Sequence, residues 1–173
     1  MIDVRFPTAL QLMLNLALAH AEGVAQLSST QLAGALGTNP SLVRKLVSPL
    51  ANAGLVRSSF GRDGGIRLGR PADAITLRDV YSAVIGEKSL WEPRAVPHQC
   101  LVSSNVERYF VDLAASADDA VLRMLERKTL ADTLSELRIL DAARQPGGLC
   151  GRAHSPMNLM ICSATARGAS SGT

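Results

Sequence analysis

The sequence predicts a mainly α-helical fold with one small β-hairpin, in which a winged helix-turn-helix is followed by a long helix. Three observations predict this fold. Capping residues mark two short helices, separated by a glycine, in the first third of the chain. A glycine-rich turn then joins two short strand-like segments. Further on, residues 104–128 carry an apolar stripe at helical spacing.

The first predicted helix runs from Thr8 to Ala21, with Thr8 as its cap and Pro7 just before it. Its leucine, methionine and alanine residues recur at helical spacing on one face, so this helix is expected to pack against a core. Hydrophobic residues make up 47% of the 173 residues, which is enough to form such a core.

Two shorter helices follow, with the spacing of a helix-turn-helix. The first of them is expected to start at Ser28 or Ser29, because Gln31 stands in the capping-box position relative to Ser28. Gly37 supplies the left-handed residue that ends this helix. The turn that follows is only a few residues long, as the motif requires.

The second helix of the motif is predicted to begin after Asn39, its cap, with Pro40 in the first position, where a missing N–H costs nothing. Gly54 ends this helix. Pro49 is expected to kink or widen the helix because it removes one backbone hydrogen bond. Five residues are predicted to face the core: Leu42, Val43, Leu46, Val47 and Leu50.

The next residues predict a β-hairpin. Leu55–Phe60 and Ile66–Gly69 are its expected strands, and Gly61–Gly65 is its turn. A helix-turn-helix followed directly by such a hairpin is a winged helix, and Arg62 at the tip is placed for a phosphate or a minor groove. A turn that cradles a nucleotide phosphate is disfavoured, because this turn joins two strands and lacks the lysine of a phosphate-binding loop.

Positive charge is concentrated in this part of the chain. Leu27–Arg70 holds six arginine and lysine residues and one aspartate, a net charge of +5, although the whole chain carries only +3. Such a segment is typical of a polyanion-binding surface, and a solvated basic face is the alternative. With the winged helix it predicts a double-stranded DNA operator as partner. The predicted DNA contacts are Ser29, Thr38, Ser41, Arg44, Lys45, Ser48, Arg57, Arg62 and Arg67.

A long amphipathic helix is predicted from a capping box at Ser104 and Glu107 to about Lys128. Its apolar stripe comprises Val106, Phe110, Leu113, Ala117, Val121 and Met124. A small winged helix does not need such a helix, so we infer a dimerisation helix and a homodimer; an intramolecular bundle helix is the alternative. A last helix follows, capped by Thr129 and ending near Arg144, with Leu130, Leu134, Leu137 and Leu140 directed inward.

The chain is therefore expected to divide into a winged helix-turn-helix DNA-binding domain at residues 1–88, a sensor-type loop at 89–103, dimerisation helices at 104–144 and a disordered tail at 145–173. No apolar run reaches membrane-spanning length and no signal peptide is recognisable, so we expect a cytoplasmic protein without a membrane partner. The sequence contains no recognisable set of nucleophile, base and acid, so we predict that the protein is not an enzyme.

Three stretches are similar to a known family: the run from Ala53 to Arg70, the run from Ile75 to Glu87, and the helix-turn-helix before them. They resemble the Rrf-two type of bacterial winged-helix regulators, which includes the iron–sulfur cluster regulator, the nitric-oxide-sensing repressor and the cysteine-metabolism repressor. The resemblance implies a homodimer that binds a partly palindromic operator. It places Ser41, Arg44 and Lys45 at the base-reading positions. It also places Arg62 at the position of the wing arginine.

The chain departs from the cluster-binding members of that family, which carry three closely spaced cysteines before the long helix. Here that segment holds Cys100 alone, so we predict no cofactor, no metal site and no iron–sulfur cluster. A cluster held by non-cysteine ligands such as His98 is an alternative. Cys100, close to His98 and to a helix N-terminus, is a candidate redox or electrophile sensor. The competing interpretation is a small buried residue.

The sequence thus predicts a dimeric DNA-binding transcriptional regulator, a repressor, controlled by redox or electrophile chemistry at Cys100 or by a small-molecule ligand. The alternative function is a winged helix used for protein–protein assembly. Such a module would not need a basic recognition helix and a basic wing tip, so an assay of operator binding separates the two functions.

Overall fold

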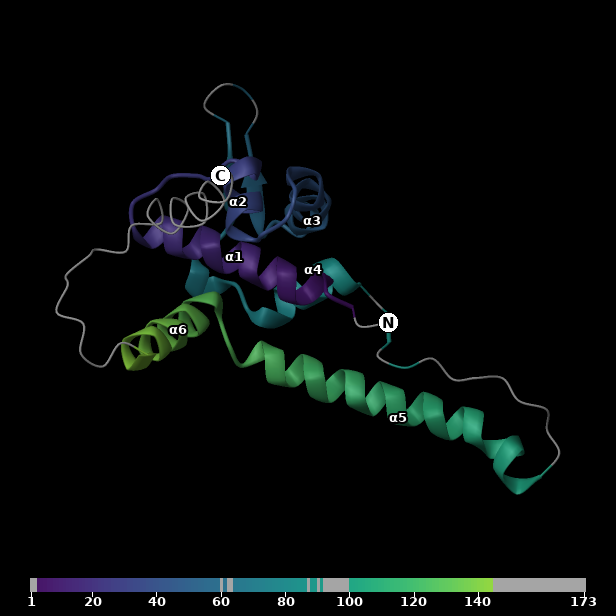
Figure 1. The fold of residues 1–173 in the computed structure, drawn as a ribbon. Helices are drawn as coiled ribbons and strands as arrows, with labels where there is room; N and C mark the ends of the chain where they lie inside the picture. The colour runs from purple at the N-terminus through teal and green to yellow at the C-terminus, as the bar shows by residue number, and fades with distance from the viewer. Residues whose placement is uncertain are drawn as a thin grey trace, which may run out of the picture.

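The computed structural model describes residues 3–59, 61, 64–86, 88–89, 91 and 100–144. Within these residues the chain forms six α-helices and one antiparallel hairpin (Figure 1). In chain order the elements are α1 (Arg5–Ala21), α2 (Ser29–Ala35), α3 (Pro40–Asn52), β1 (Val56–Ser58), β2 (Ile66–Leu68), the 3-10 helix η1 (Ala72–Ala74), α4 (Leu77–Ile85), α5 (Leu101–Glu126) and α6 (Leu130–Arg144). The predicted mainly helical winged-helix fold is confirmed.

α1 is the central helix of the fold. α2, α3 and the hairpin lie on one side of it, and α6 lies on the other (Figure 1). One apolar core joins these elements, and the described residues include no buried polar or charged side chain. The largest fully buried side chains include Leu12, Met13, Leu32, Leu50, Leu55, Ile75 and Leu130.

α1 starts three residues before the predicted start at Thr8. Its N-cap is Val4, and the Thr8 hydroxyl donates a hydrogen bond to the Val4 carbonyl at 2.7 Å. Pro7 therefore lies in the first turn, where backbone N–H groups have no acceptor within the helix, so proline's lack of an N–H breaks no hydrogen bond. Arg5 ties this turn to the end of α4, because its Nη1 donates to the Val84 carbonyl at 3.0 Å. That contact joins residues far apart in the chain, so no local pattern could reveal it.

The helix-turn-helix has the predicted caps. The Gln31 N–H donates to Ser28 Oγ at 3.1 Å, and the Ser28 N–H donates to Gln31 Oε1 at 2.8 Å, which completes the capping box of α2. Gly37 has a φ of 62°, the left-handed conformation that ends the helix. Asn39 caps α3 by accepting the Leu42 N–H at 2.9 Å.

The hairpin is shorter than predicted, with three residues in each strand. Its register pairs Val56 with Leu68, Arg57 with Arg67, and Ser58 with Ile66. On the other edge of β2, Leu27 and Ile66 exchange two backbone hydrogen bonds of 2.9 and 2.8 Å. At Ile66, β2 therefore lies between β1 on one side and Leu27 on the other. Because Leu27 directly precedes the cap of α2, this pairing joins the hairpin to the start of the helix-turn-helix.

β2 ends where the chain passes very close to the turn after α3. The Gly69 N–H donates to the Leu55 carbonyl at 2.8 Å. A Cβ atom on Gly69 would lie 2.3 Å from the Gly54 carbonyl oxygen, a distance that real Cβ atoms do not show. Only glycine fits at this crossing of two backbones.

A second close crossing joins α4 to the end of α5. Residues 75–77 and 128–130 exchange two backbone hydrogen bonds of 2.9 Å each, with Thr76 opposite Thr129. An ion pair of 2.8 Å between Arg78 and Glu126 lies beside them. We call residues 75–77 and 128–130 the α4–α6 junction. It attaches α5 and α6 to the winged helix by backbone contacts.

α5 begins earlier than predicted. Cys100 is its N-cap and Ser103 completes the capping box, so the predicted cap Ser104 and its partner Glu107 lie inside the helix. Leu101–Ser103, part of the predicted loop at 89–103, are helical. The sequence prediction missed this start because cysteine is not among the usual capping residues.

Most of α5 lies outside the core and extends away from the rest of the fold (Figure 1). Ala114 and Leu125 are its only buried residues. On α6, Leu130 and Leu134 are buried as predicted, but Leu137 and Leu140 are 44% and 63% exposed, so the prediction that they face inward is wrong. The reason is that only the first two turns of α6 are buried.

Candidate nucleic-acid interface

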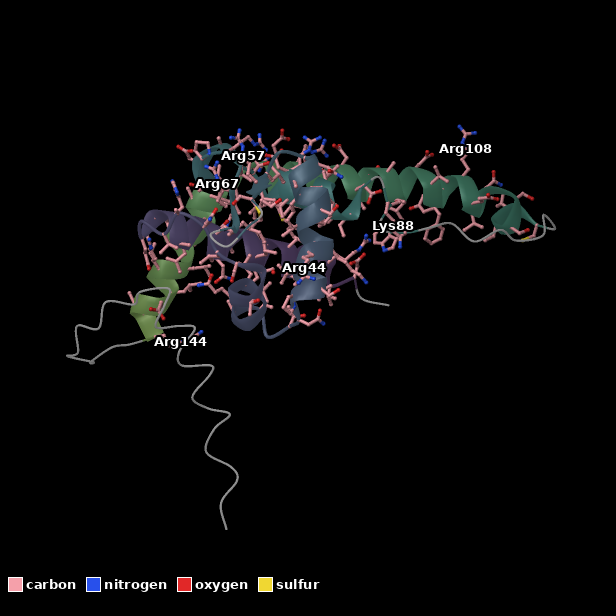
Figure 2. The ribbon with its side chains drawn as sticks, turned by 90° about the horizontal axis from the view of Figure 1, so that it is seen from above. Arg44, Arg57, Arg67, Lys88, Arg108 and Arg144 are labelled. Atoms are coloured by element: carbon pink, nitrogen blue, oxygen red, sulfur yellow. The ribbon has the colours of Figure 1, made fainter. Side chains whose placement is uncertain are left out.

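α3 has one buried apolar face and one exposed polar face. Val43, Leu46, Val47 and Leu50 are buried as predicted. The exposed residues include Ser41, Arg44, Lys45 and Ser48, all of which we predicted to contact DNA. Figure 2 shows Arg44 on α3. α3 continues through Pro49 to Asn52 as a single helix, so the four polar side chains share one surface.

Leu42 is not in the core, contrary to the prediction. It is 38% exposed and lies beside Ser41 in the first turn of α3. Leu42 lies four residues before the buried Leu46, so its spacing matches the apolar face, but it is in the first turn of α3, at the edge of that face. An exposed leucine beside the polar face can contact the methyl group of thymine. Its helical spacing is that of a core residue, so the sequence carries no signal of this exposure.

The other two predicted contacts of the helix-turn-helix lie at the ends of α2. Ser29 is the first residue of α2 and is half-buried. Thr38 lies in the turn before α3, also half-buried, and its N–H donates to the Ala33 carbonyl at 2.9 Å. Ser29 is close to the positive end of the α2 dipole, where a phosphate is favoured.

Arg57 and Arg67 are directly opposite each other on the hairpin, and both are exposed (Figure 2). Like charges in opposite positions of two strands repel each other. Neither arginine forms an ion pair with any of the described residues, whereas Arg70, just after β2, is paired with Asp79 at 3.1 Å. A phosphate group between the two guanidinium groups would remove the repulsion.

Hydrogen bonds and close packing hold the hairpin together where its strands meet the turn. Ser59 donates from Oγ to Gln26 Oε1 at 3.1 Å, and its N–H donates to the Gly65 carbonyl at 2.9 Å. A Cβ on Gly65 would lie 2.9 Å from Gln26 Cγ, so glycine lets Gln26 pack against the hairpin. The predicted tip residue Arg62 lies outside the described residues.

Cys100 lies at the opposite end of α5 from the winged helix, and it is exposed. The interpretation of Cys100 as a buried residue is therefore wrong. The Ser103 hydroxyl and N–H each donate to its Sγ at 3.5 Å. These hydrogen bonds, the hydroxyl first, lower the pKa of the Cys100 thiol because they stabilise the thiolate. The second predicted sensor residue, His98, lies outside the described residues.

No group of three His, Cys, Asp or Glu side chains could hold a metal in the part of the chain that the structure describes. Cys100 is the one cysteine in that part. One thiolate cannot supply the ligand set of an iron–sulfur cluster. None of the described helices is long and apolar enough to cross a membrane.

Comparison with known proteins relates this geometry to one family. The Rrf2 family model, described as an iron-dependent transcriptional regulator, matches residues 2–136. The HTH-type transcriptional regulator CymR of Bacillus subtilis (strain 168) is 36% identical over 126 residues, which cover 73% of this chain and 83% of CymR. YwnA, a putative HTH-type transcriptional regulator of the same organism, is 31% identical over 111 residues, 64% of this chain and 83% of YwnA.

Solved structures of similar proteins support the same family. The structure of B. subtilis CymR has a TM-score of 0.57 and 30% identity, over 79% of this chain and 97% of that chain. The oxidized form of Staphylococcus aureus CymR has a TM-score of 0.55 and 27% identity, over 78% and 95%. The T. potens IscR structure, at 22% identity and a TM-score of 0.57 over 86% and 93%, shares the fold. The protein belongs to the Rrf2 family of DNA-binding transcriptional regulators.

Proposed function

We propose that the protein is a homodimeric repressor that binds a partly palindromic DNA operator. One observation carries the proposal: the exposed face of α3 presents Arg44 and Lys45, while the hairpin presents a pair of exposed arginines. An α-helix fits the major groove, where arginine and lysine recognise guanine. The hairpin pair provides the phosphate contact that positions the helix.

The proposed interface, which comprises the polar face of α3 and the hairpin, makes two kinds of contact. Ser41, Arg44 and Lys45 read base edges, and the exposed Leu42 adds an apolar contact to a thymine methyl. Arg57 and Arg67 bind the backbone, as does the hairpin tip with Arg62. Backbone contacts supply most of the salt-dependent affinity, and base contacts supply the sequence preference.

α5 supports the proposed homodimer. Its 26 residues make a helix about 39 Å long, and its first half contains no buried residue within the part of the chain that the structure describes. Val102, Tyr109, Leu113 and Met124 form an exposed apolar stripe, with exposures of 67%, 66%, 41% and 61%. Covering such a stripe is favourable by about 25 cal/mol per Å². A second copy related by two-fold symmetry would cover it, and would present two recognition helices to the two halves of a palindrome.

An Arg44→Ala variant is expected to bind the preferred duplex about tenfold more weakly and to discriminate less among bases at one position, because a bidentate contact to guanine is worth about 1–3 kcal/mol. The preferred duplex is first selected from a random library with the wild-type protein. Fluorescence anisotropy against single-base variants of this duplex then measures the change.

The matched control for this experiment is Arg144→Ala, which removes an exposed arginine at the end of α6, remote from α3 (Figure 2). It has the same charge change, so equal losses in both variants would contradict the assignment of α3 as the recognition helix. Failure of the wild-type protein to select any duplex would favour a winged helix used for protein–protein assembly.

Regulation by oxidation or alkylation of Cys100 is also part of the proposal. The thiol is exposed, caps a helix and has a lowered pKa. Ser103→Ala should raise this pKa, since it removes the hydrogen bond that contributes most. The midpoint of the pH profile of Cys100 alkylation by iodoacetamide then moves to higher pH. Peptide mass spectrometry measures it, with Cys150 and Cys162 as internal references.

Ser103→Thr keeps the hydroxyl and should keep the wild-type midpoint, so it is the control for a general effect on the helix start. The link to regulation is tested by titrating peroxide into the wild-type protein and Cys100→Ser, each bound to operator DNA. An equal loss of binding in the two proteins would show that Cys100 is not the sensor.

The description of the family as iron-dependent does not fit the described donor atoms, which include a single thiol and no group of three metal ligands. We therefore propose regulation without an iron–sulfur cluster. An ultraviolet–visible spectrum of protein purified without oxygen tests this, because a bound cluster would colour the protein.

A further inference from the structure

A cavity of about 230 Å³ opens between the C-terminal end of α1 and the free edge of β2. Its floor is apolar, and includes Leu16 and Ala19, each 2% exposed. The exposed residues His20, Ala25 and Arg67 also line it. The cavity is separate from the polar face of α3, but its wall is a strand of the hairpin.

The wall of this cavity contains an unpaired backbone position. In β2, the N–H and C=O of Ile66 point to Leu27 and those of Arg67 point to β1, so the groups of Leu68 point to the same edge as those of Ile66. Within the described residues, neither the N–H nor the C=O of Leu68 has a hydrogen-bond partner. One donor and one acceptor therefore lie at the free edge of β2, beside an apolar floor.

The free edge is only about one residue long. On one side, Ile66 is already paired with Leu27. On the other side, the strand ends at Leu68, because Gly69 and Arg70 form a bend, and Pro71 has no N–H. An added β-strand would need several consecutive free positions, so the edge does not suit an extended peptide.

We propose that this cavity binds a small α-amino acid with a short apolar side chain. Its carboxylate accepts from the Leu68 N–H, and its ammonium group donates to the Leu68 carbonyl, as a paired residue of a neighbouring strand would do. Arg67 provides positive charge for the carboxylate, since the other arginine of the wall, Arg70, is held by Asp79. The side chain of the amino acid rests on Leu16 and Ala19.

The occupant would act on DNA binding through β2. Arg67 belongs to the arginine pair assigned to the DNA backbone and is the immediate neighbour of Leu68. A ligand that engages both Arg67 and the strand edge competes with that contact and lowers operator affinity. This part of the inference rests on the proposed function, whereas the binding site itself does not.

Isothermal titration calorimetry of the full chain without DNA tests the site. The probes are L-alanine and L-valine, with propionate and ethylamine as analogues that lack the ammonium or the carboxylate. Saturable binding of at least one of the two amino acids, one per chain, and at least tenfold weaker binding of both analogues, are expected. No saturable binding of either amino acid, or equal binding of either analogue, would overturn the site.

Two variants at one position isolate the backbone donor. Leu68→Pro removes the N–H, which the β1–β2 ladder does not use, and should weaken amino-acid binding at least tenfold. Leu68→Ala keeps the N–H and removes most of the side chain, so it should bind nearly as the wild type does. Ala25→Leu, at an exposed lining position, narrows the cavity and should also weaken binding. Thermal unfolding curves verify that each variant is folded, and unchanged binding by folded Leu68→Pro contradicts the proposal.

Fluorescence anisotropy of operator DNA, measured with and without L-valine, separates amino-acid binding from its effect on DNA binding. Operator binding without any amino-acid binding leaves the proposed function standing and overturns the site. Amino-acid binding with unchanged operator affinity keeps the site and overturns its coupling to DNA. A protein that binds amino acids but no DNA keeps the site and overturns the proposed function.

Discussion

A Leu113→Asp chain is expected to sediment as a monomer and to bind the operator about a hundredfold more weakly than the wild type, because linking two binding modules typically adds a factor of 10² or more in affinity. Leu113 lies in the middle of the exposed stripe of α5. A carboxylate there meets water in the monomer but would be buried without a partner between two copies. The variant therefore keeps its fold and loses its partner. Analytical ultracentrifugation and fluorescence anisotropy measure the two effects.

The control is Ala115→Asp on the same helix. Ala115 is also exposed, but it lies two residues further on and so points to the opposite side of α5. The same charge is added outside the proposed dimer surface, with a slightly larger loss of helix propensity, so the control is the more demanding one for the helix itself. A Leu113→Asp protein that remains dimeric, or an Ala115→Asp protein that dissociates equally, would contradict dimerisation through the stripe.

Gly69→Ala is expected to destabilise the protein by about 3 kcal/mol or more, within the range of mutations that strain the backbone or overpack a core. The added Cβ would meet the Gly54 carbonyl oxygen at 2.3 Å and its carbon at 3.1 Å. Both partners are backbone atoms, so no side-chain rotation relieves the contact, and the end of β2 must separate from the turn after α3. Urea unfolding followed by circular dichroism measures the loss.

Gly34→Ala provides the contrast. Gly34 lies inside α2 with nothing within 4 Å of an added Cβ, and alanine is the better helix former there by about 1 kcal/mol. That variant should gain stability by up to this amount. If Gly69→Ala unfolded at the same urea concentration as the wild type, the close crossing of Gly69 and Gly54 would be refuted.

The sequence predicted the winged helix well because its boundaries are set by neighbouring residues. The caps Ser28 and Asn39 each accept an N–H from the residue three positions further on, so they can be read directly from the sequence. The capping box of α4 between Thr76 and Asp79 and the left-handed Gly86 at its end are likewise formed by residues close together in the sequence. The concentration of positive charge in Leu27–Arg70 predicted a polyanion, DNA, as the partner.

What sequence reasoning missed depends on tertiary contacts or on exposure. The start of α1 is supported by a hydrogen bond from Arg5 to Val84, and the start of α5 depends on a cysteine in the role of a cap. Leu137 and Leu140 have the spacing of core residues, because helical spacing alone does not distinguish an exposed apolar residue from a buried one. The Arg57–Arg67 pair required the strand register, which two short strands do not specify.

The α4–α6 junction has a consequence for which operators the protein can use. In the proposed dimer, the path from one α3 to the other runs through this junction twice and along both copies of α5. The junction is closed by backbone hydrogen bonds, whose geometry does not change when surface side chains change. The distance between the two half-sites is therefore a property of the scaffold, and the base sequence of each half-site is a property of α3. Substitutions on α3 would alter which bases are read while the number of base pairs between the half-sites stays the same.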